Sequence, residues 1–381
     1  MKIGIVCYPT FGGSGVVATE LGIGLAGAGH EVHFITYKRP VRLTSFHTNI
    51  FFHEVSALEY PLFEYTPYES SLASKLVDVI RFEHLDILHV HYAIPHATVA
   101  YITKQILAAQ GIKLPVITTL HGTDITLVGA DSSFSPVVEF SINQSDGVTA
   151  VSDHLKTETL QNFKILKDIR VIPNFIDFTR FRKINKDHFR KAIASQGEKI
   201  LIHISNFRKV KRVEDIVRIF EIVHRVIPSK LLLIGDGPER KNLEDLCRQL
   251  ELVEDVKFLG KQEAVEELLA ISDVFILPSE NESFGLAALE AMACEVPVVS
   301  SNAGGIPEVN LDGITGYVCE IGDIRGMAEK CISLLSDDKK LSILRKQAFE
   351  HAKKYDINNL LVEYIDYYEE IIQKVNSNPA K

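Results

Sequence analysis

Short apolar runs alternate along the chain with longer segments whose apolar residues recur every three or four positions. The first run, 3–7, leads through a glycine-rich stretch into an apolar segment at 16–28 and a second run at 32–36. This order predicts strand, glycine turn, helix and strand. Later elements continue the alternation, with strands expected at 87–90, 116–120 and 147–151 and helices at 72–82 and 98–110. The fold class is therefore α/β, with a doubly wound parallel sheet.

The same pattern starts again after 171–174. A second set of elements is expected, with strands at 200–204, 230–234, 256–259, 274–277 and 296–300 and helices at 213–226, 239–250 and 284–293. Two Rossmann-like domains follow, 1–172 and 173–357, joined by a linker near 171–177. Because ligands of such sheets bind at the carboxyl ends of the strands, we expect the site in a crevice that both domains face.

The tail 358–381 carries an apolar stripe at helical spacing. Such a stripe is most often a packing face, and we expect the helix to pack back on the N-terminal domain. A membrane-surface or partner helix remains the alternative, although the opposite face is acidic rather than basic.

Composition excludes several classes of protein. The chain has 381 residues and a net charge of -9, so neither a basic nucleic-acid binder nor a polybasic membrane protein is indicated. Five cysteines form no Cys-x-x-Cys pair, which favours reduced thiols and the cytoplasm. No apolar run approaches the length of a membrane span, and the apolar run at 3–7 is too short for a signal peptide.

Two carboxylates, Glu282 and Glu290, bracket the predicted start of a helix. Ser283, Phe284, Gly285 and Leu286 lie at its N-terminus, where unpaired amides and the helix dipole favour an anion such as a diphosphate. At about 1.5 Å per residue, the two glutamates are spaced to bind hydroxyl groups on either side of that anion. The pattern is typical of a nucleotide-sugar site.

Loops after the predicted strands supply further candidates. The stretch Gly12 to Gly15 resembles a dinucleotide turn, but Thr36 to Arg39 stand where NAD sites carry an acidic residue. An NADP site, a structural turn, or a loop whose amides approach a phosphate or an acceptor all remain open, with Ser14 and Gly15 as candidates. In the second domain, Asn206 and Lys211 follow the first strand, and Gly260 and Lys261 end a later one, where a base could lie.

Ten of the fourteen histidines fall in 1–172. The spacing of His89, His91 and His96 matches no helical metal-ligand pair, so packed or site histidines are favoured over zinc. His91 and Tyr92 end one predicted strand, and His121 and Thr123 follow another. We expect these residues to line an acceptor pocket.

Taken together, the motifs Gly-Gly-Ser-Gly, His121-Gly-Thr-Asp, 206–211, Gly-Asp-Gly-Pro, Glu282-x7-Glu290 and Gly304-Gly305 resemble the retaining GT-B glycosyltransferases over nearly the whole chain. The stretches Cys7-Tyr-Pro, Leu120-His-Gly-Thr-Asp-Ile-Thr and Ser205-Asn-Phe-Arg-Lys-Val-Lys-Arg are similar to the branch that acts in bacterial bacillithiol synthesis. That resemblance implies transfer of N-acetylglucosamine from its UDP donor to the hydroxyl of L-malate, with retention and with neither a metal nor a cofactor.

The resemblance also implies residue roles. Glu290 would bind the ribose, Glu282 the donor sugar, and the amides of 283–286 together with Lys211 the diphosphate. His121 would lie beside the donor sugar, so that Lys211, Glu282 and His121 form the catalytic set. Asn206 departs from the family, which often has arginine there, and Arg208 or Arg212 could compensate. Ser14, His91, Tyr92 and Thr123 are the expected acceptor contacts.

Three other functions stay open on the sequence. A UDP-N-acetylglucosamine 2-epimerase shares the architecture but needs no acceptor. A transferase that acts on an inositol phosphate or a lipid, and a UDP-binding module without activity, are the other two. Small-molecule substrates, no nucleic acid, no membrane span and a possible homo-oligomer complete the expectations.

Overall fold

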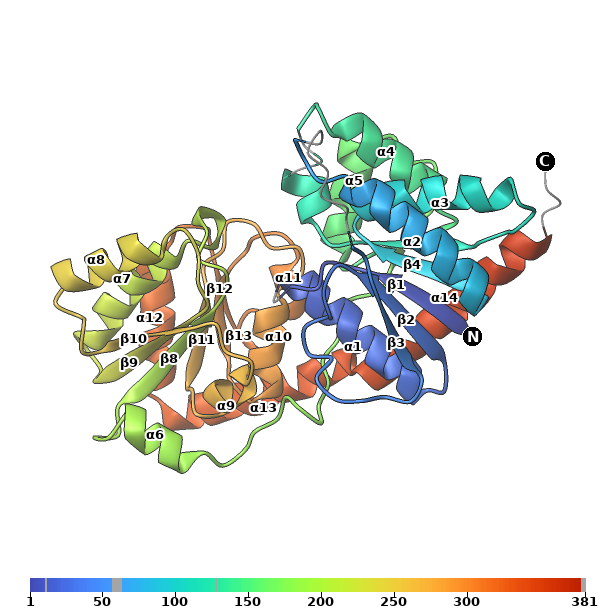
Figure 1. Ribbon diagram of the computed structural model, residues 1–381. Helices are drawn as coiled ribbons and strands as arrows, with labels where there is room; N and C mark the ends of the chain where they lie inside the picture. The colour runs from blue at the N-terminus through green and yellow to red at the C-terminus, as the bar shows by residue number, and fades with distance from the viewer. Residues whose placement is uncertain (11, 57–63, 128, 130, 378–381) are drawn as a thin grey trace. The chain divides into compact units, whose positions relative to one another are not determined.

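The computed structural model describes residues 1–10, 12–56, 64–127, 129 and 131–377, and it folds into two compact units (Figure 1). Unit 1 comprises Met1–Asn174 and Ile357–Lys381, and unit 2 comprises Phe175–Asp356. The last four residues of the predicted tail, 378–381, lie outside the described residues. Each unit contains its own parallel sheet.

Unit 1 is built on a seven-stranded sheet of order β3-β2-β1-β4-β5-β6-β7, in which every neighbouring pair is parallel. The strands are β1 (Lys2–Val6), β2 (Glu31–Thr36), β3 (Ile50–Glu54), β4 (Ile87–His91), β5 (Val116–Leu120), β6 (Gly147–Ala150) and β7 (Arg170–Val171). Its helices are α1 (Gly13–Gly27), α2 (Tyr68–Glu83), α3 (Thr98–Ala108), α4 (Ser135–Gln144), α5 (Asp153–Asn162) and α14 (Ile357–Ser377), with π-helical turns at Ala93–Ala97 and Thr123–Leu127.

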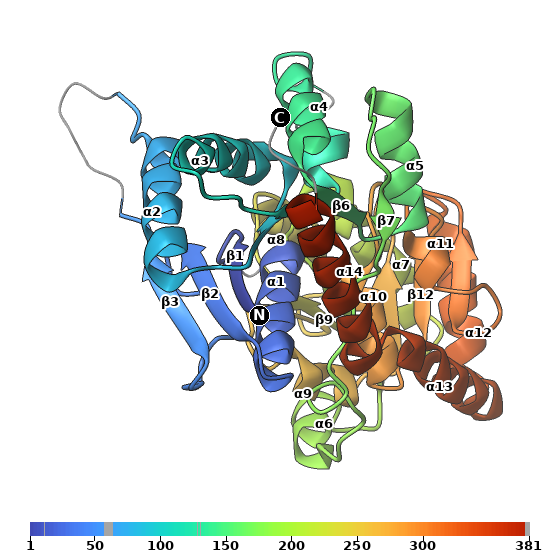
Figure 2. The same ribbon diagram turned by 90° about the vertical axis from the view of Figure 1, so that its right-hand side faces the viewer.

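Alternation along the strands of unit 1 sends side chains to two helical layers. Leu88 and Val90 of β4 belong to the apolar cluster that α2 and α3 complete on one face of the sheet. On the other face, α1 packs so closely that a Cβ on Gly22 would lie 2.3 Å from the Phe34 ring. α14 lies beside α1 on this second face (Figure 2). His89 of β4 reaches α14, where His89 Nδ1 lies 2.7 Å from the Tyr368 hydroxyl.

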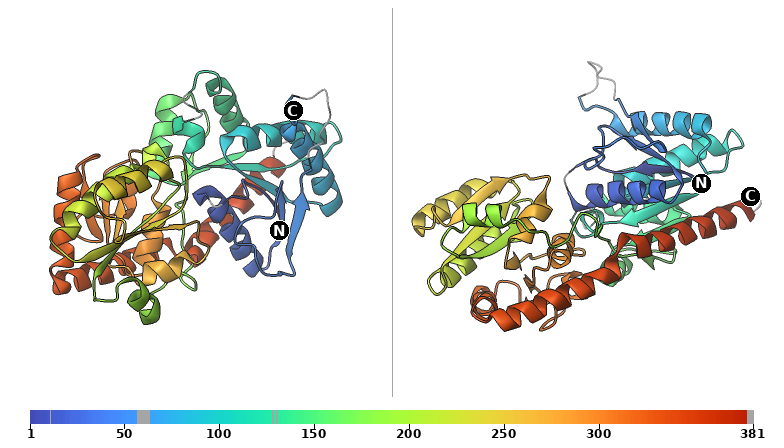
Figure 3. Two further views of the ribbon diagram at one scale, coloured as in Figure 1. Left: turned by 60° about the vertical axis from the view of Figure 1, so that its left-hand side comes forward. Right: turned by 90° about the horizontal axis from the view of Figure 1, so that it is seen from below.

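Unit 2 repeats the design with a six-stranded sheet of order β10-β9-β8-β11-β12-β13, again parallel throughout. The strands are β8 (Lys199–Ile204), β9 (Ser229–Ile234), β10 (Val256–Gly260), β11 (Val274–Leu277), β12 (Val298–Ser301) and β13 (Gly316–Cys319). The helices are α6 (Asp187–Ile193), α7 (Val213–His224), α8 (Arg240–Gln249), α9 (Val265–Ala270), α10 (Leu286–Ala293), α11 (Ile306–Val309), α12 (Ile324–Leu335) and α13 (Asp338–Ala352), and 3-10 turns lie at Lys209–Lys211 and Lys353–Tyr355. Helices cover both faces of this sheet (Figure 3).

The predicted α/β class and doubly wound sheets are confirmed, and the strands foreseen from the apolar runs are present with ends shifted by one or two residues. The edge strands β3, β7 and β13 were not foreseen. β3 shows why, because its five residues are only partly buried and lack a continuous apolar run. The helix predicted at 284–293 begins at Leu286 instead, since Gly285 has φ +94° and ends the preceding loop in the left-handed region.

The tail helix α14 packs on unit 1. Its residues Tyr364, Tyr368 and Ile371 are almost fully buried, and the Tyr367 hydroxyl lies 3.0 Å from the backbone nitrogen of Val148 in β6. The apolar stripe is therefore a packing face. In the part of the chain that the structure describes, no helix combines the length and the apolar character that crossing a bilayer requires.

Candidate active site

In unit 2, β8 and β11 are neighbours at the point where the strand order reverses, and the loops that follow them carry Lys211 and Glu282. Such reversal points are where doubly wound sheets bind ligands. Lys211 Nζ lies 2.6 Å from Glu282 Oε2, and each side chain keeps about one fifth of its surface exposed. The cation and the carboxylate predicted to bind the donor therefore meet in one ion pair.

Backbone contacts hold these two loops together. The Glu280 amide donates to the Val210 carbonyl at 2.8 Å, and the Gly305 amide donates to the Glu282 carbonyl at 2.9 Å. A Cβ on Gly304 would lie only 2.0 Å from the Glu282 carbonyl oxygen, so the close approach requires glycine. The glycine pair is thus a packing requirement of the Glu282 loop, not merely a flexible turn.

The start of α10 presents the amides expected to bind phosphate. The Gly285 carbonyl accepts hydrogen bonds from Ala288 at 2.9 Å and Leu289 at 3.1 Å, so the amides of Leu286 and Ala287 precede the first bonded turn. The helix has eight residues, and its dipole places partial positive charge at this end. Ser283, Phe284 and Gly285 belong to the loop that leads into it.

Glu290 lies on the second turn of α10 and is 6% exposed. A carboxylate this buried needs polar partners, because burial without them is costly. Glu290, the residue predicted to bind the ribose, is therefore largely buried within unit 2.

The other predicted donor contacts of unit 2 are more open. Asn206 and Lys261 are exposed, and Gly260 has φ +64° and accepts the Gly235 amide at 2.8 Å. Of the two arginines that could replace the missing family arginine, Arg212 is paired with Asp215 at 2.6 Å, whereas Arg208 is exposed. Arg208 is thus better placed to supply charge to a ligand.

In unit 1 the strand order also reverses between β1 and β4. There Ser14, in the first turn of α1, meets Tyr92, which follows β4. The Tyr92 hydroxyl donates to Ser14 Oγ at 2.7 Å. Tyr92 has φ +84°, an uncommon conformation for a tyrosine. Gly15 is buried, and a Cβ there would lie 2.4 Å from the Tyr8 carbonyl, so this glycine lets the loop pack on the start of α1.

The predicted histidines form a buried chain beneath these loops. His91 Nδ1 lies 2.8 Å from His121 Nε2, and His89 Nε2 lies 2.7 Å from the Thr119 hydroxyl. His96 Nδ1 donates to the His91 carbonyl at 2.6 Å, which leaves its Nε2 as the lone-pair nitrogen. Among the described residues, His91 Nε2 and His96 Nε2 have no hydrogen-bond partner.

Burial makes these histidines neutral. It lowers the pKa of His89 and His121 to about 3 and that of His96 to about 4. The pKa of His91 is lowered as well, first by burial and then by the neighbouring rings. The cluster can therefore donate and accept hydrogen bonds at neutral pH but contributes no positive charge.

Asp124 anchors the loop that carries Thr123, which is exposed. Its carboxylate accepts the backbone amides of Ala93 at 2.9 Å, Gly122 at 3.0 Å and His121 at 3.3 Å. Burial raises its pKa to about 6 even though these amides favour the ionised form. Sequence reasoning noted Asp124 only as part of a motif, because its amide partners lie in two different loops.

Tyr8 was not predicted as a site residue, and His96 was predicted only as a packed or site histidine. Their rings lie 4.6 Å apart, and Tyr8 also packs edge-on against Tyr92 at 5.5 Å. The aromatic layer brings together residues 8, 92 and 96, so only proximity after folding reveals it. Cys7-Tyr8-Pro9 was recognisable as a motif without indicating this contact.

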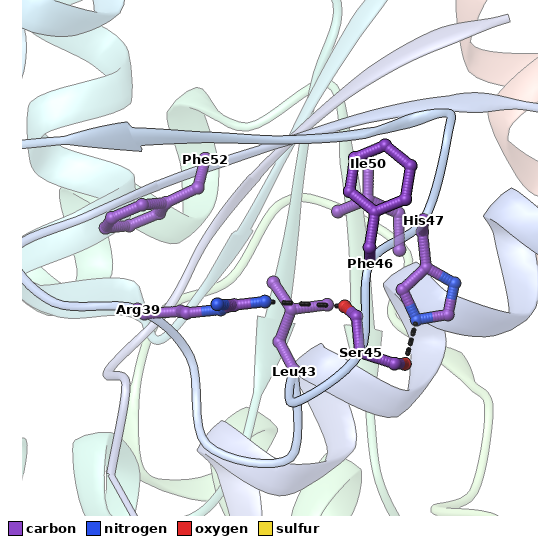
Figure 4. A pocket seen from close by; sticks show the side chains of 7 residues that line it. All are labelled: Arg39, Leu43, Ser45, Phe46, His47, Ile50 and Phe52. Atoms are coloured by element: carbon purple, nitrogen blue, oxygen red, sulfur yellow. Dashed lines mark hydrogen bonds between the residues drawn. The ribbon is translucent and has the colours of Figure 1, made fainter.

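A pocket of about 150 Å³ lies elsewhere in unit 1, and none of the predicted site residues line it (Figure 4). The Arg39 guanidinium donates to the Ser45 carbonyl across it at 3.4 Å, and the Ser45 hydroxyl is hydrogen-bonded to His47 at 3.0 Å. Phe46 is 87% exposed at its rim. The pocket is mostly apolar and offers no cradle for a diphosphate.

Comparison with known proteins matches two segments of the chain to glycosyltransferase families. Residues 185–351 match the family described as glycosyl transferases group 1, and residues 11–180 match glycosyltransferase family 4. N-acetyl-alpha-D-glucosaminyl L-malate synthase of Bacillus anthracis is 49% identical over 375 residues, which cover 98% of each chain.

Solved structures agree on the architecture. Sucrose-phosphate synthase from Thermosynechococcus elongatus matches with a TM-score of 0.82 and 19% identity, covering 98% of this chain and 100% of that one. Anabaena Alr3699/HepE, solved in complex with UDP and glucose, also matches with a TM-score of 0.82, at 20% identity and with 97% and 100% coverage. The predicted GT-B fold is thereby confirmed.

Proposed function

Because this chain belongs to the glycosyltransferases, as a relative of the N-acetyl-alpha-D-glucosaminyl L-malate synthase of Bacillus anthracis over 98% of its length, we propose that it transfers N-acetylglucosamine from UDP-N-acetylglucosamine to the hydroxyl of L-malate. The 49% identity is the observation that carries this proposal, since it extends through both units. The reaction would be the first step of bacillithiol synthesis.

Unit 2 supplies the charge that such a reaction needs. UDP leaves as an anion, so transfer is accelerated by positive charge held where the diphosphate gains negative charge. In this proposal the amides at the start of α10 and the Lys211 ammonium supply it. Glu290 binds the ribose hydroxyls and Glu282 the donor sugar, and neither glutamate acts as a nucleophile.

The ion pair between Lys211 and Glu282 affects donor binding in two opposite ways. At 2.6 Å the two groups satisfy each other, so the diphosphate has to compete with the carboxylate for the ammonium. The pair also holds Lys211 at the ligand end of the sheet before the donor arrives. Preorganised charge of this kind lowers the barrier without reorganisation during the reaction.

Unit 1 contributes neutral polar groups to the acceptor. Ser14, Tyr92 and Thr123 keep exposed surface and are the proposed contacts to malate, together with His91. His91 is fully buried and contacts His121, so its direct contact with the acceptor stays a prediction. His121 is 9% exposed and is the proposed neighbour of the donor sugar.

The proposed chemistry retains configuration and uses no metal or cofactor. The acceptor hydroxyl attacks the anomeric carbon on the face that UDP leaves. The new C–O bond forms as the bond to the diphosphate breaks, and the hydroxyl proton passes to a phosphate oxygen. A cytoplasmic location belongs to the proposal, because all five cysteines are free thiols and a reducing compartment keeps them so.

The decisive experiment is incubation of UDP-N-acetylglucosamine with L-malate, D-malate, an inositol phosphate and lipid vesicles, with UDP release and product mass as readouts. We expect UDP release that depends on L-malate and a product with an α-anomeric proton by NMR. Epimer release from the donor alone would favour the epimerase. Product with the inositol phosphate or the vesicles, but not with malate, would replace the acceptor.

A further inference from the structure

Three side chains at one edge of the unit 1 sheet place their ligand atoms around a common point. His33 lies on β2, His53 lies on the edge strand β3, and Glu83 is the last residue of α2. One ligand atom from each lies within 4.8 Å of the others, which is the one such group of histidine, cysteine and carboxylate side chains found among the described residues. None of the three belongs to the motifs that indicate glycosyl transfer.

The parallel register of β2 and β3 creates this arrangement. His33 is opposite Phe51 and Ile35 is opposite His53, so the two histidines are diagonal neighbours on one face of the sheet. His33 Nδ1 lies 2.9 Å from His53 Nε2, and the rings are within 14° of parallel. His33 is fully buried, whereas His53 and Glu83 are half-buried, which leaves a path from solvent.

A carboxylate behind His33 fixes which nitrogen faces the group. Glu31 Oε1 lies 3.0 Å from His33 Nε2, and the same carboxylate oxygen is paired with Lys2 Nζ at 2.8 Å. An ionised Glu31 favours the N–H on Nε2, so the Nδ1 lone pair points toward His53 and Glu83. Metal-bound histidines are commonly oriented by such a carboxylate on the opposite nitrogen.

We propose that His33 Nδ1, His53 Nε2 and the Glu83 carboxylate form a zinc site, with Glu31 as the outer carboxylate that orients His33. Two imidazoles and one carboxylate are a ligand set that Zn²⁺ accepts, and water can complete the tetrahedron. With Zn–N bonds of about 2.0 to 2.1 Å, tetrahedral geometry places the two nitrogens about 3.3 Å apart. The observed 2.9 Å requires a shift of only a few tenths of an ångström.

The ion would join three elements at an exposed edge of the fold. β3 is the terminal strand of the sheet and pairs with β2 alone (Figure 2). A single zinc bound to β2, β3 and the end of α2 would fasten this edge strand to the body of unit 1. The expected consequence is higher thermal stability when zinc is bound, because a ligand that binds only the folded chain shifts the unfolding equilibrium.

The test is isothermal titration of the metal-free protein with Zn²⁺, performed on the chain carrying Cys319→Ser to remove its one partly exposed thiol. We expect saturable binding of one ion per chain. His53→Ala and Glu83→Gln should each weaken the affinity at least tenfold, and Glu31→Gln by roughly 10- to 100-fold as for other outer carboxylates. His154→Ala is the matched control, since it removes a half-exposed histidine beside Glu158 and should leave binding unchanged.

A thermal melt provides the second readout. Zinc should raise the melting temperature of the parent chain and leave that of Glu83→Gln unchanged, and far-UV circular dichroism verifies that each variant is folded. Absence of saturable binding by the parent chain would overturn the proposal. Equal affinities of the parent, His53→Ala and Glu83→Gln would overturn it as well.

Discussion

The two units place their ligand loops at the same topological position but hold them together with different chemistry. In unit 2 the loops after β8 and β11 meet through the ion pair of Lys211 and Glu282 at 2.6 Å. In unit 1 the loop after β4 meets the start of α1, which follows β1, through a neutral hydrogen bond from Tyr92 to Ser14 at 2.7 Å. One fold thus provides a charged site and an uncharged one.

The difference does not follow from the charge of the ligands, because L-malate is a dicarboxylate, but from what each unit is proposed to do during transfer. A diphosphate carries charge throughout the reaction. Unit 2 is proposed to stabilise that charge with a partly exposed lysine and with the start of a helix. Unit 1 instead buries four histidines whose pKa values are lowered by burial. Its polar groups orient and position, whereas those of unit 2 stabilise charge.

The largest expected difference between the two units is the loss of folding stability at acidic pH. The buried histidines 89, 91, 96 and 121 bind protons only when unfolded, so their contribution to stability is present above pH 6.5 and is lost as pH falls. Asp124, with its pKa raised to about 6, opposes them by holding one proton in the folded state. Four protons minus one leaves three, so the unfolded chain binds about three more protons than the folded chain near pH 5. The free energy of unfolding therefore falls by on the order of 4 kcal/mol per pH unit there.

Hydrogen exchange measured peptide by peptide between pH 7 and 5 checks this expectation. After correction for intrinsic rates, β4 and β5 should lose protection before β8 and β11. Unit 1 has four buried histidines, whereas in unit 2 burial lowers the histidine pKa only for His203, to about 4, and for the half-buried His351. His89→Gln, which keeps one donor and one acceptor, should make the decline shallower. Earlier loss of protection in unit 2 would contradict the expectation that unit 1 is the more acid-sensitive unit.

The second prediction concerns the charged site. Lys211→Ala should lower turnover roughly 10²- to 10³-fold, the usual effect of removing one group that stabilises developing charge. Lys209→Ala is the matched control, because it removes an exposed cation from the same 3-10 turn. Steady-state kinetics of UDP release measures both variants. Equal turnover of Lys211→Ala and the parent enzyme would remove Lys211 from the mechanism.

The third prediction addresses donor affinity. Glu290→Ala should weaken UDP binding roughly 10- to 100-fold, because it removes the proposed contact between a charged group and the ribose, and one hydrogen bond to a charged group is worth about 1.5 to 3 kcal/mol. Calorimetric titration with UDP measures the effect. Glu280→Ala, which removes an exposed carboxylate from the loop after β11, should bind UDP normally. A Glu290→Ala protein with parental affinity would contradict the ribose assignment.

The smallest effect is expected in unit 1. Tyr92→Phe removes the neutral hydrogen bond to Ser14, which is worth about 0.5 to 1.5 kcal/mol, and should raise the KM for malate a few-fold. Turnover at saturating malate should change little. Ser14→Ala should have a similar effect, and the double variant should be no worse than either single variant. Fully additive losses would show that the two residues act separately.

The apolar pattern of the sequence was sufficient to predict both sheets and most central strands. Runs such as 116–120 and 274–277 coincide with the strands observed, because buried parallel strands are apolar on both faces. Glu282 and Glu290 were also identified as candidates, since a helix start with flanking carboxylates is a local pattern. Lys211 was identified from its place in the loop after the first strand of the second domain and from the family resemblance. The half-exposed edge strand β3 has no such pattern and was missed.

Only the tertiary structure decided which distant residues meet. Asp124 accepts amides from two separate loops, and His89 bonds to Tyr368, which lies 279 positions further along the chain. Sequence spacing contains no signal for such pairs, because they depend on how parallel strands stack and where α14 packs. The chain itself thus determined the elements and the charged motif. Strand register and helix packing determined the neutral histidine cluster and the diagonal pair of His33 and His53.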